Sequence, residues 1–280
     1  MTLIEEGSEL NVPPHHLATV SFLNHSYEVA MFACAAMTEA IDVLKKDKGR
    51  KNVHDIRVSF RRWFSIWNVL QDGWDSKRYR ERIGDDLRRA YKALGEVRDW
   101  DVVVKIATQS MVPQLIIDKM ENRRDRARDR SFKVLKSLKL GRLLSRLEKY
   151  LNKRFESLSS DAEKSTQPAK SAYKQLEEFL EDREIETREL LSTASTLKEL
   201  HGVRLSIKAW RYLLAEFFGL SSVELVRAQQ LLGQLNDIER LRIFLQDCDE
   251  DGKEEPIENL HAESEKLLES WSELKIALPF

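Results

Sequence analysis

The placement of the prolines constrains the fold of this chain most strongly. Only six prolines occur among the 280 residues, at positions 13, 14, 113, 168, 256 and 279. Because proline breaks the interior of an α-helix, the long stretches between these positions are free to be helical. Apolar residues recur there with a helical period, and no alternating run of strand length occurs. The sequence therefore predicts an all-α fold.

Turn residues and apolar periodicity divide the chain further. We expect a flexible N-terminal tail over residues 1–25 and then helices over residues 25–46, 52–70, 77–94, 113–158, 170–190, 197–218, 222–232, 237–247 and 257–275. Gly95 should end one helix, and Asp99 or Asp101 should cap the next, with Asp237 as a second cap. The polar segment 159–168 predicts a boundary between two helical bundles, over residues 26–160 and 161–280.

The net charge of −1 conceals a strong segregation of charge along the chain. Residues 119–142 contain ten Lys and Arg against three acids, whereas residues 247–280 contain eleven acids against three Lys. A neutral total argues against an indiscriminately basic protein that coats nucleic acid. Local charge is therefore more informative than the sum.

A row of basic residues runs along one predicted helix, in the stretch LHGVRLSIKAWRY. Its members recur at i, i+3, i+7 and i+10 and are His201, Arg204, Lys208 and Arg211. The neighbouring stripe is wholly apolar and consists of Leu200, Val203, Ile207, Trp210 and Leu214. Cations confined to one stripe of a mostly buried helix would repel one another unless an anion lay between them. The pattern thus favours an anion-binding cleft over the alternative, a solvated helix face.

The two halves of the sequence repeat one another. VHDIRVSFRRWF, residues 53–64, aligns with LHGVRLSIKAWR, residues 200–211, and LGEVRDWD, residues 94–101, aligns with LGQLNDIE, residues 232–239. The first alignment gives the basic row of the first half, which consists of His54, Arg57 and Arg61. Two motifs in the same order in each half indicate an internal duplication.

These motifs resemble those of the CHAD domain, the conserved histidine α-helical domain. The shared pattern is His-x-x-Arg-x-x-x-Lys/Arg-x-x-Arg followed by Leu-Gly-x-Val/Leu-Arg/Asn-Asp, and the first half departs from it at Phe64, where a cation would stand. The resemblance covers about residues 26–280. It implies two bundles related by pseudo-twofold symmetry around a basic central cavity that binds inorganic polyphosphate. It also implies that the residues lining that cavity are His54, Arg57, Arg61, His201, Arg204, Lys208 and Arg211.

A further basic segment, residues 122–142, supplies weaker candidates. Arg124, Arg128 and Lys139 are placed as further candidates for the same cavity, with ordinary surface charge as the alternative. Arg98 lies in the Leu-Gly motif and is equally consistent with a salt bridge to Asp99 or Asp101.

No catalytic or metal-binding pattern emerges from the sequence. EIETR, residues 184–188, imitates a metal-binding strand motif, but on a helix its two acids diverge by about 200°. No Walker-type phosphate loop, nucleophile–base pair or clustered metal ligands occur, and His15 and His16 stand without carboxylates nearby. We therefore expect no catalytic residues, no metal and no cofactor.

Two other functions stay open as alternatives: an enzyme of polyphosphate or phosphate metabolism, and a binder of the nucleic-acid backbone. The tryptophans at 63, 67 and 210 fall on apolar stripes instead of between cations, which makes base stacking unlikely. No apolar segment approaches the length of a membrane span, and the acidic N-terminus is unlike a signal peptide. We expect a cytoplasmic protein, and the family resemblance implies an association with polyphosphate granules.

Overall fold

The computed structural model describes residues 15–74, 77–164 and 167–280, and every regular element in these ranges is helical. The elements are α1 (His15–Lys46), α2 (Arg50–Trp74), α3 (Lys77–Tyr79), the π-helix η1 (Arg80–Gly84), α4 (Asp85–Gln109), α5 (Gln114–Leu138), α6 (Leu140–Lys164), α7 (Gln167–Thr193), α8 (Leu197–Phe218), α9 (Val223–Gln246) and α10 (Glu254–Ile276). The all-α class is confirmed.

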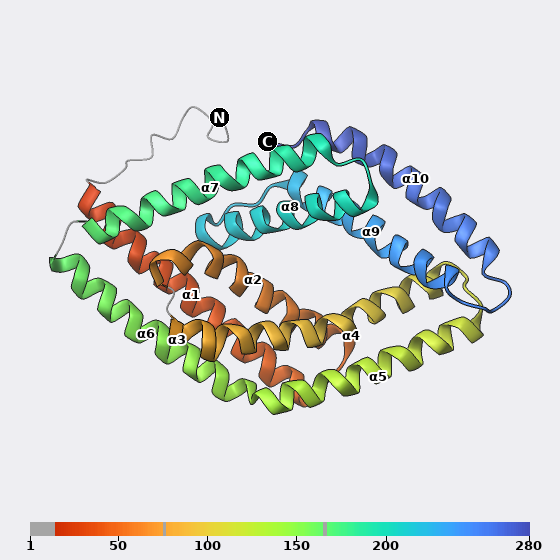
Figure 1. The fold of residues 1–280 in the computed structure, drawn as a ribbon, viewed down its shortest axis with the longest axis horizontal. Helices are drawn as coiled ribbons and strands as arrows, with labels where there is room; N and C mark the ends of the chain where they lie inside the picture. The colour runs from red at the N-terminus through yellow and green to blue at the C-terminus, as the bar shows by residue number, and fades with distance from the viewer. Residues whose placement is uncertain (1–14, 75–76, 165–166) are drawn as a thin grey trace.

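The helices form an elongated assembly with an inner and an outer set. Helices α2, α4, α8 and α9 surround the middle of the molecule, whereas α5 and α6 follow one long edge and α7 and α10 the other (Figure 1). Within the inner set, α2 packs against both α4 and α8, and α9 packs against both α4 and α8. Helix α1 packs against α2, α6 and α7. The two helices that carry the basic rows, α2 and α8, are therefore direct neighbours.

Two hydrophobic clusters hold the helices together, and each draws on both halves of the chain. The larger cluster joins the buried faces of α1, α2, α4 and α6 to those of α8 and the first part of α9. The smaller one joins the end of α4 and the start of α5 to the end of α9, for example through Val104, Ile116 and Leu241. The division into bundles at residue 160 stays a prediction, since neither core stops there.

Local signals explain why α8 begins and ends where the sequence predicts. Thr196 accepts a hydrogen bond from the Glu199 amide, and the Glu199 carboxylate accepts from the amides of Ser195 and Thr196, both at 2.9 Å. This capping box satisfies amides that the first helical turn leaves free, and it lowers the pKa of Glu199 to about 2. At the other end Gly219 adopts the left-handed conformation, with φ of 64°.

The expected breaks at the two Leu-Gly motifs are wrong. Helix α4 continues through Gly95 and Asp99 to Gln109, and α9 continues through Gly233 and Asp237 to Gln246, so neither aspartate caps a helix. Asp101 is likewise inside α4 and buried. The glycines have another role, described below: each lies where a side chain of a neighbouring helix passes close to the backbone.

Two other boundaries differ from expectation. The helix predicted over residues 113–158 is divided at Lys139, a non-glycine residue with φ of 50° and ψ of 54°, which ends α5 and starts α6. Helix α1 begins at His15, inside the segment expected to be a flexible tail. Residues 1–14 of that tail lie outside the described residues.

The cap of α8 yields a prediction on stability. Thr196→Ala removes the hydroxyl that accepts the Glu199 amide, so we expect the free energy of unfolding to fall by about 1 kcal/mol in a denaturant titration. The control is Thr193→Ala, whose exposed hydroxyl bonds only to the Glu189 carbonyl at the end of α7. Equal losses for the two variants would contradict the assigned cap.

Candidate functional site: two basic rows on neighbouring helices

The basic rows occupy the partly buried edge of helices whose other face is in the core. On α2 the apolar stripe is buried as predicted, with Phe60 and Trp63 fully covered; on α8 the same holds for Val203 and Ile207. The side chains of Arg57, Arg61, Arg204, Lys208 and Arg211 are neither fully buried nor fully exposed. Beyond the rows, an ion pair of 3.1 Å joins Arg62 of α2 to Glu216 of α8.

Arg57 is held against the backbone of α4. Its Nη1 donates a 2.7 Å hydrogen bond to the carbonyl oxygen of Tyr91, and its guanidinium lies 4.3 Å from the centre of the Tyr91 ring. A Cβ atom on Gly95 would stand 3.0 Å from that same Nη1. The absence of a side chain at Gly95 therefore gives Arg57 its path across α4.

Arg204 passes Gly233 of α9 in a looser contact. A Cβ on Gly233 would lie 3.6 Å from Nε of Arg204. The Leu-Gly motif of each half thus provides a backbone surface for the arginine of the basic row of the same half. The sequence predicts a helix end at Gly95, because the packing of this glycine depends on a helix distant in the sequence.

Tyr212 connects the two rows directly. Its ring centre lies 6.0 Å from the guanidinium carbon of Arg61 on α2 and 5.4 Å from that of Arg211 on α8. Cations attracted by one aromatic ring come here from both halves of the sequence. Phe64, which replaces a cation of the family pattern, packs edge-on against Tyr91 at 5.5 Å.

The cations of the two rows are close enough to repel one another. Burial, together with the charges of Arg61, Arg204, Arg57 and Arg211, lowers the pKa of Lys208 to about 7. Burial also lowers the pKa of Arg204, and Arg61 of the other row contributes to that shift. The Nε atoms of Arg61 and Arg204 are buried, and no hydrogen-bond partner reaches them from the described parts of the chain.

The two histidines have different neighbours. The Asn236 carbonyl oxygen accepts a 2.8 Å hydrogen bond from Nδ1 of His201, so Nε2 of that ring donates to an anion only when the ring is protonated. Among the described residues, no side chain accepts a hydrogen bond from His54 in this way. Burial lowers the pKa of His54, and the nearby charge of Arg98, which aligns with Asn236, acts in the same direction.

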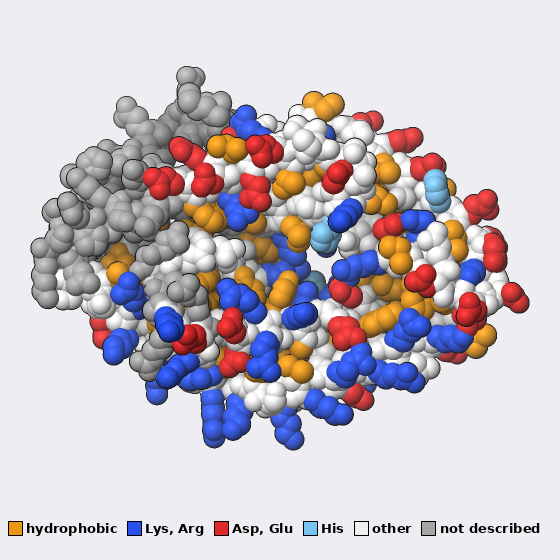
Figure 2. Space-filling model, in the orientation of Figure 1, with side chains coloured by type: hydrophobic (Ala, Val, Ile, Leu, Met, Phe, Trp, Pro, Cys, Tyr) orange, Lys and Arg blue, Asp and Glu red, His pale blue; other side chains and the backbone are white. Residues whose placement is uncertain are grey.

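Acidic groups lie at the border of this cluster. Asp99 forms a 2.6 Å ion pair with Arg240, joining α4 to α9. Burial raises the pKa of Asp237, opposed by its hydrogen bond from Asn236 and by the charges of Arg204 and Arg240. A pocket of about 1000 Å³ opens here between α4, α8, α9 and α10, lined by Arg98, Arg204, Arg227, Gly233, Asp237 and Glu273 among others. Figure 2 shows an opening near the middle of the molecule, bordered by Lys, Arg and His side chains.

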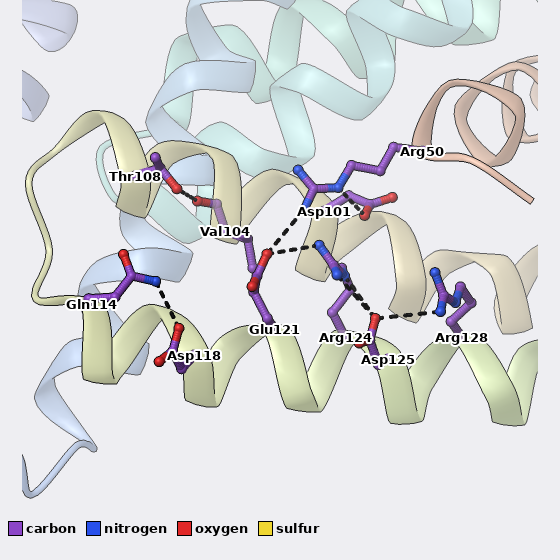
Figure 3. Close-up of polar contacts among 10 residues, drawn as sticks. All are labelled: Arg50, Asp101, Val104, Thr108, Gln114, Asp118, Glu121, Arg124, Asp125 and Arg128. Atoms are coloured by element: carbon purple, nitrogen blue, oxygen red, sulfur yellow. Dashed lines mark hydrogen bonds and ion pairs between the residues drawn. The ribbon is translucent and has the colours of Figure 1, made fainter.

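The remaining sequence candidates lie in other surroundings. Arg124 is 15% exposed and pairs with Glu121 at 3.3 Å and with Asp125 at 3.1 Å, and Arg128 pairs with Asp125 at 3.8 Å (Figure 3). Arg128 and Lys139 line a separate pocket between the α1–α2 loop and the joint of α5 and α6. The structure thus groups these two apart from the row on α8.

Several groups near the rows carried no recognisable signal in the sequence. Arg227 and Arg240 of α9 reach the cluster, but neither belongs to the repeated motif.

Over the described ranges no group of three or more His, Cys, Asp and Glu side chains is placed to hold a metal ion. None of the described helices combines the length and apolarity that crossing a membrane requires.

The contrast between the two motif glycines predicts a difference in stability. Gly233→Ala should raise the free energy of unfolding by about 0.5–1 kcal/mol, because alanine favours a helix and its Cβ meets Arg204 at ordinary contact distance. Gly95→Ala should not raise the free energy of unfolding. Its Cβ would lie only 3.0 Å from Nη1 of Arg57 and would displace that group from its hydrogen bond to the Tyr91 carbonyl. Equal gains in denaturant titrations of both variants would contradict this packing.

The proximity of the rows is testable through Lys208. Arg61→Met removes the charge that contributes most to lowering the pKa of Lys208 after burial, so that pKa should rise above about 7. NMR titration of labelled lysine side chains measures the shift directly. Arg62→Met, which removes the neighbouring charge paired with Glu216, is the matched control and should leave the pKa of Lys208 where it is. An unchanged pKa of Lys208 in both variants would contradict the proximity of the two rows.

Comparisons with solved structures agree on the fold. The CHAD domain from the plant Ricinus communis superimposes with a TM-score of 0.58 at 17% identity, covering 94% of this chain and 92% of that one. PptA from Streptomyces chartreusis superimposes with a TM-score of 0.63 at 11% identity, covering 91% of this chain and 98% of that one. At such identities the likeness concerns the fold alone. No curated protein matches the sequence.

The family itself follows from the sequence pattern, which the geometry above explains residue by residue. The pattern of the CHAD domain matches residues 30–246, a span that contains both basic rows and both Leu-Gly motifs. The chain belongs to the CHAD domain family.

Proposed function

We propose that this protein binds inorganic polyphosphate, without catalysis, between the basic rows of α2 and α8. One observation carries the proposal: the cations of the rows are close together and partly buried, and the charges of Asp99 and Asp237 only partly oppose the lowering of the pKa of Arg57 and Arg204. Within the described residues, no carboxylate lies at ion-pair distance from Arg57, Arg61, Arg204, Lys208 or Arg211, although ion pairs are frequent elsewhere in the chain. A multiply charged anion would remove the repulsion among these groups.

Phosphate oxygens fit the donors that the rows present. Each guanidinium offers several N–H groups in a planar fork, and Lys208 adds a compact charge with three donors. Arg57 keeps one N–H on the Tyr91 carbonyl, which fixes its orientation while the others stay available. Successive phosphates of a linear chain would contact successive members of the rows, and release of counterions would supply much of the affinity.

The aromatic side chains near the rows favour polyphosphate over nucleic acid. Tyr91 is covered by Arg57, Phe64 packs on Tyr91, and Tyr212 is buried and flanked by two cations. Binders of single-stranded nucleic acid need exposed rings on which bases stack. The rows provide groups for phosphate but no free ring for a base.

The two rows act as one site in this proposal. The internal duplication would place one row and one Leu-Gly helix in each half, and the Arg57–Gly95 and Arg204–Gly233 contacts support this equivalence. Facing rows in a shared space would exclude water from the anion and so strengthen each contact. By the family resemblance we also propose a cytoplasmic location with access to polyphosphate granules.

Removal of the α8 cations tests the site. We expect Arg204→Ala, Lys208→Ala and Arg211→Ala together to weaken polyphosphate binding by about 100-fold or more, since charged hydrogen bonds contribute about 1.5–3 kcal/mol each. The slope of log affinity against log salt should also become less steep by about two to three, as fewer counterions are released. Calorimetry or fluorescence anisotropy at several salt concentrations measures both.

The matched control replaces three cations on helices other than α2 and α8. Lys77, Lys105 and Lys266 are exposed, and their replacement by alanine changes the net charge by the same amount. This control should retain the affinity of the parent protein. A folded α8 triple variant with unchanged affinity and salt slope would refute the site.

The pKa of Lys208 predicts a pH dependence of binding. A bound polyanion favours protonated Lys208 and so raises its pKa from about 7, which means that the complex holds more protons than the free protein above pH 7. Affinity should therefore increase as pH falls from 9 to 7, by up to about tenfold per pH unit. Lys208→Met should flatten this range. An equally steep profile in that variant would assign the proton to another group.

A further inference from the structure

A second set of cations lies on the outside of the molecule. Exposed basic side chains follow one another from the end of α5 along α6, and we name them the outer track: Lys133, Lys136, Lys139, Arg142, Arg146, Lys149 and Lys153. Lys and Arg side chains crowd the lower edge of the view in Figure 2, where Figure 1 places α5 and α6. None of these residues belongs to the rows on α2 and α8.

The part of the outer track on α6 forms one face of that helix. Arg142, Arg146, Lys149 and Lys153 are spaced by four, three and four residues, which aligns them over about 16 Å. Glu148 of the same helix points elsewhere, since it lines a different pocket together with Cys34 and Lys46 of α1. The face therefore presents one sign of charge along its length.

At its other end the outer track enters a pocket of about 1100 Å³. The α1–α2 loop adds Lys45 and Lys48 to the basic lining there. The lining also contains the carboxylates of Asp47 and Asp129. Asp47 is engaged within its own loop, where it accepts hydrogen bonds from the Gly49 amide at 2.9 Å and from the Asn52 amide group at 2.8 Å. The side chains that line the pocket therefore carry a strongly positive net charge.

The outer track is poorly neutralised by the protein. In the described ranges the only carboxylate at ion-pair distance from any of its members is Asp86, which lies 3.7 Å from Arg146. On the exposed side of α7, by contrast, Arg183 pairs with Glu186 and Arg188 with Glu184. Ordinary surface helices of this chain thus balance their charges, and the outer track does not.

Lys139 stands at the joint of α5 and α6 in the left-handed conformation that glycine adopts most readily. This conformation is unfavourable for lysine, because its Cβ comes too close to the following carbonyl oxygen. The bend at Lys139 lets Lys136 of α5 and Arg142 of α6 line the same pocket. The charged side chain of Lys139 therefore lies in the middle of the outer track, although its backbone conformation is unfavourable.

We propose that the outer track is a second polyphosphate site, which contacts the part of a long chain that the central rows leave free. This inference rests on the proposed function of those rows. A single ligand that touches both sites gains affinity from the high effective concentration of its second segment. Nucleic acid is a poorer fit, because Lys48 covers the Phe132 ring at 4.9 Å and Tyr150 packs against Tyr79 and Trp67.

The test compares short and long polyphosphate chains of defined size. The outer-track variant carries Lys136→Gln, Lys139→Gln and Lys149→Gln, and the matched control carries Lys77→Gln, Lys105→Gln and Lys266→Gln. We expect the outer-track variant to bind long chains about tenfold or more weakly than the parent and short chains as tightly. The control should match the parent for both lengths. Lys139→Gly, which removes the charge and suits the backbone, should weaken long-chain binding while raising thermal stability.

Each outcome separates this inference from the proposed function. Long-chain binding that is equally tight in the outer-track variant and the control would overturn the outer site while leaving the central rows intact. Absence of short-chain binding in the parent would instead refute the proposed function. Unchanged polyphosphate binding together with lost RNA binding in the outer-track variant would assign the outer track to RNA and overturn polyphosphate as its ligand.

Discussion

The packing of an arginine side chain against a glycine of the neighbouring helix determines where the cations of the two basic rows lie. Arg57 crosses α4 at Gly95 and bonds to a backbone carbonyl, and Arg204 crosses α9 at Gly233. Arg57 is thereby positioned by backbone and aromatic contacts, and within the described residues neither arginine forms an ion pair with a carboxylate. An arginine held by a carboxylate would already be neutralised, whereas these arginines keep their charge available to a ligand.

In this arrangement the cations of the rows on α2 and α8 repel one another. Contacts elsewhere in the fold keep the two rows together in spite of this repulsion. Large buried side chains on the opposite faces of α2 and α8, such as Trp63 and Ile207, hold the rows near one another. Two ion pairs between the halves lie at the border of the rows: Arg62 with Glu216 joins α2 to α8, and Asp99 with Arg240 joins α4 to α9. The lowered pKa of Lys208 is the clearest consequence. In our proposal a polyanion relieves this repulsion.

The sequence predicted the features that depend on neighbours along the chain. The bounds of α8, the all-α class and the buried stripes of α2 and α8 follow from capping residues and helical periodicity. The sequence misled where distant contacts decide: it predicts a helix end at Gly95 and another just before Gly233, whereas both glycines lie inside helices and face an arginine of another helix. Arg240 had no signal, since its partner Asp99 is 141 residues away in the sequence.

The number of binding sites per chain tests the central claim most directly. Isothermal titration of short polyphosphate into the parent protein, Arg57→Glu, Arg204→Glu and the double variant gives stoichiometry and affinity together. If the rows form one site, the parent binds one short chain, and each single reversal weakens all binding. The double variant should then lose less than the sum of the single losses. Two independent sites, each abolished only by its own reversal, would contradict a shared site and leave two separate basic surfaces.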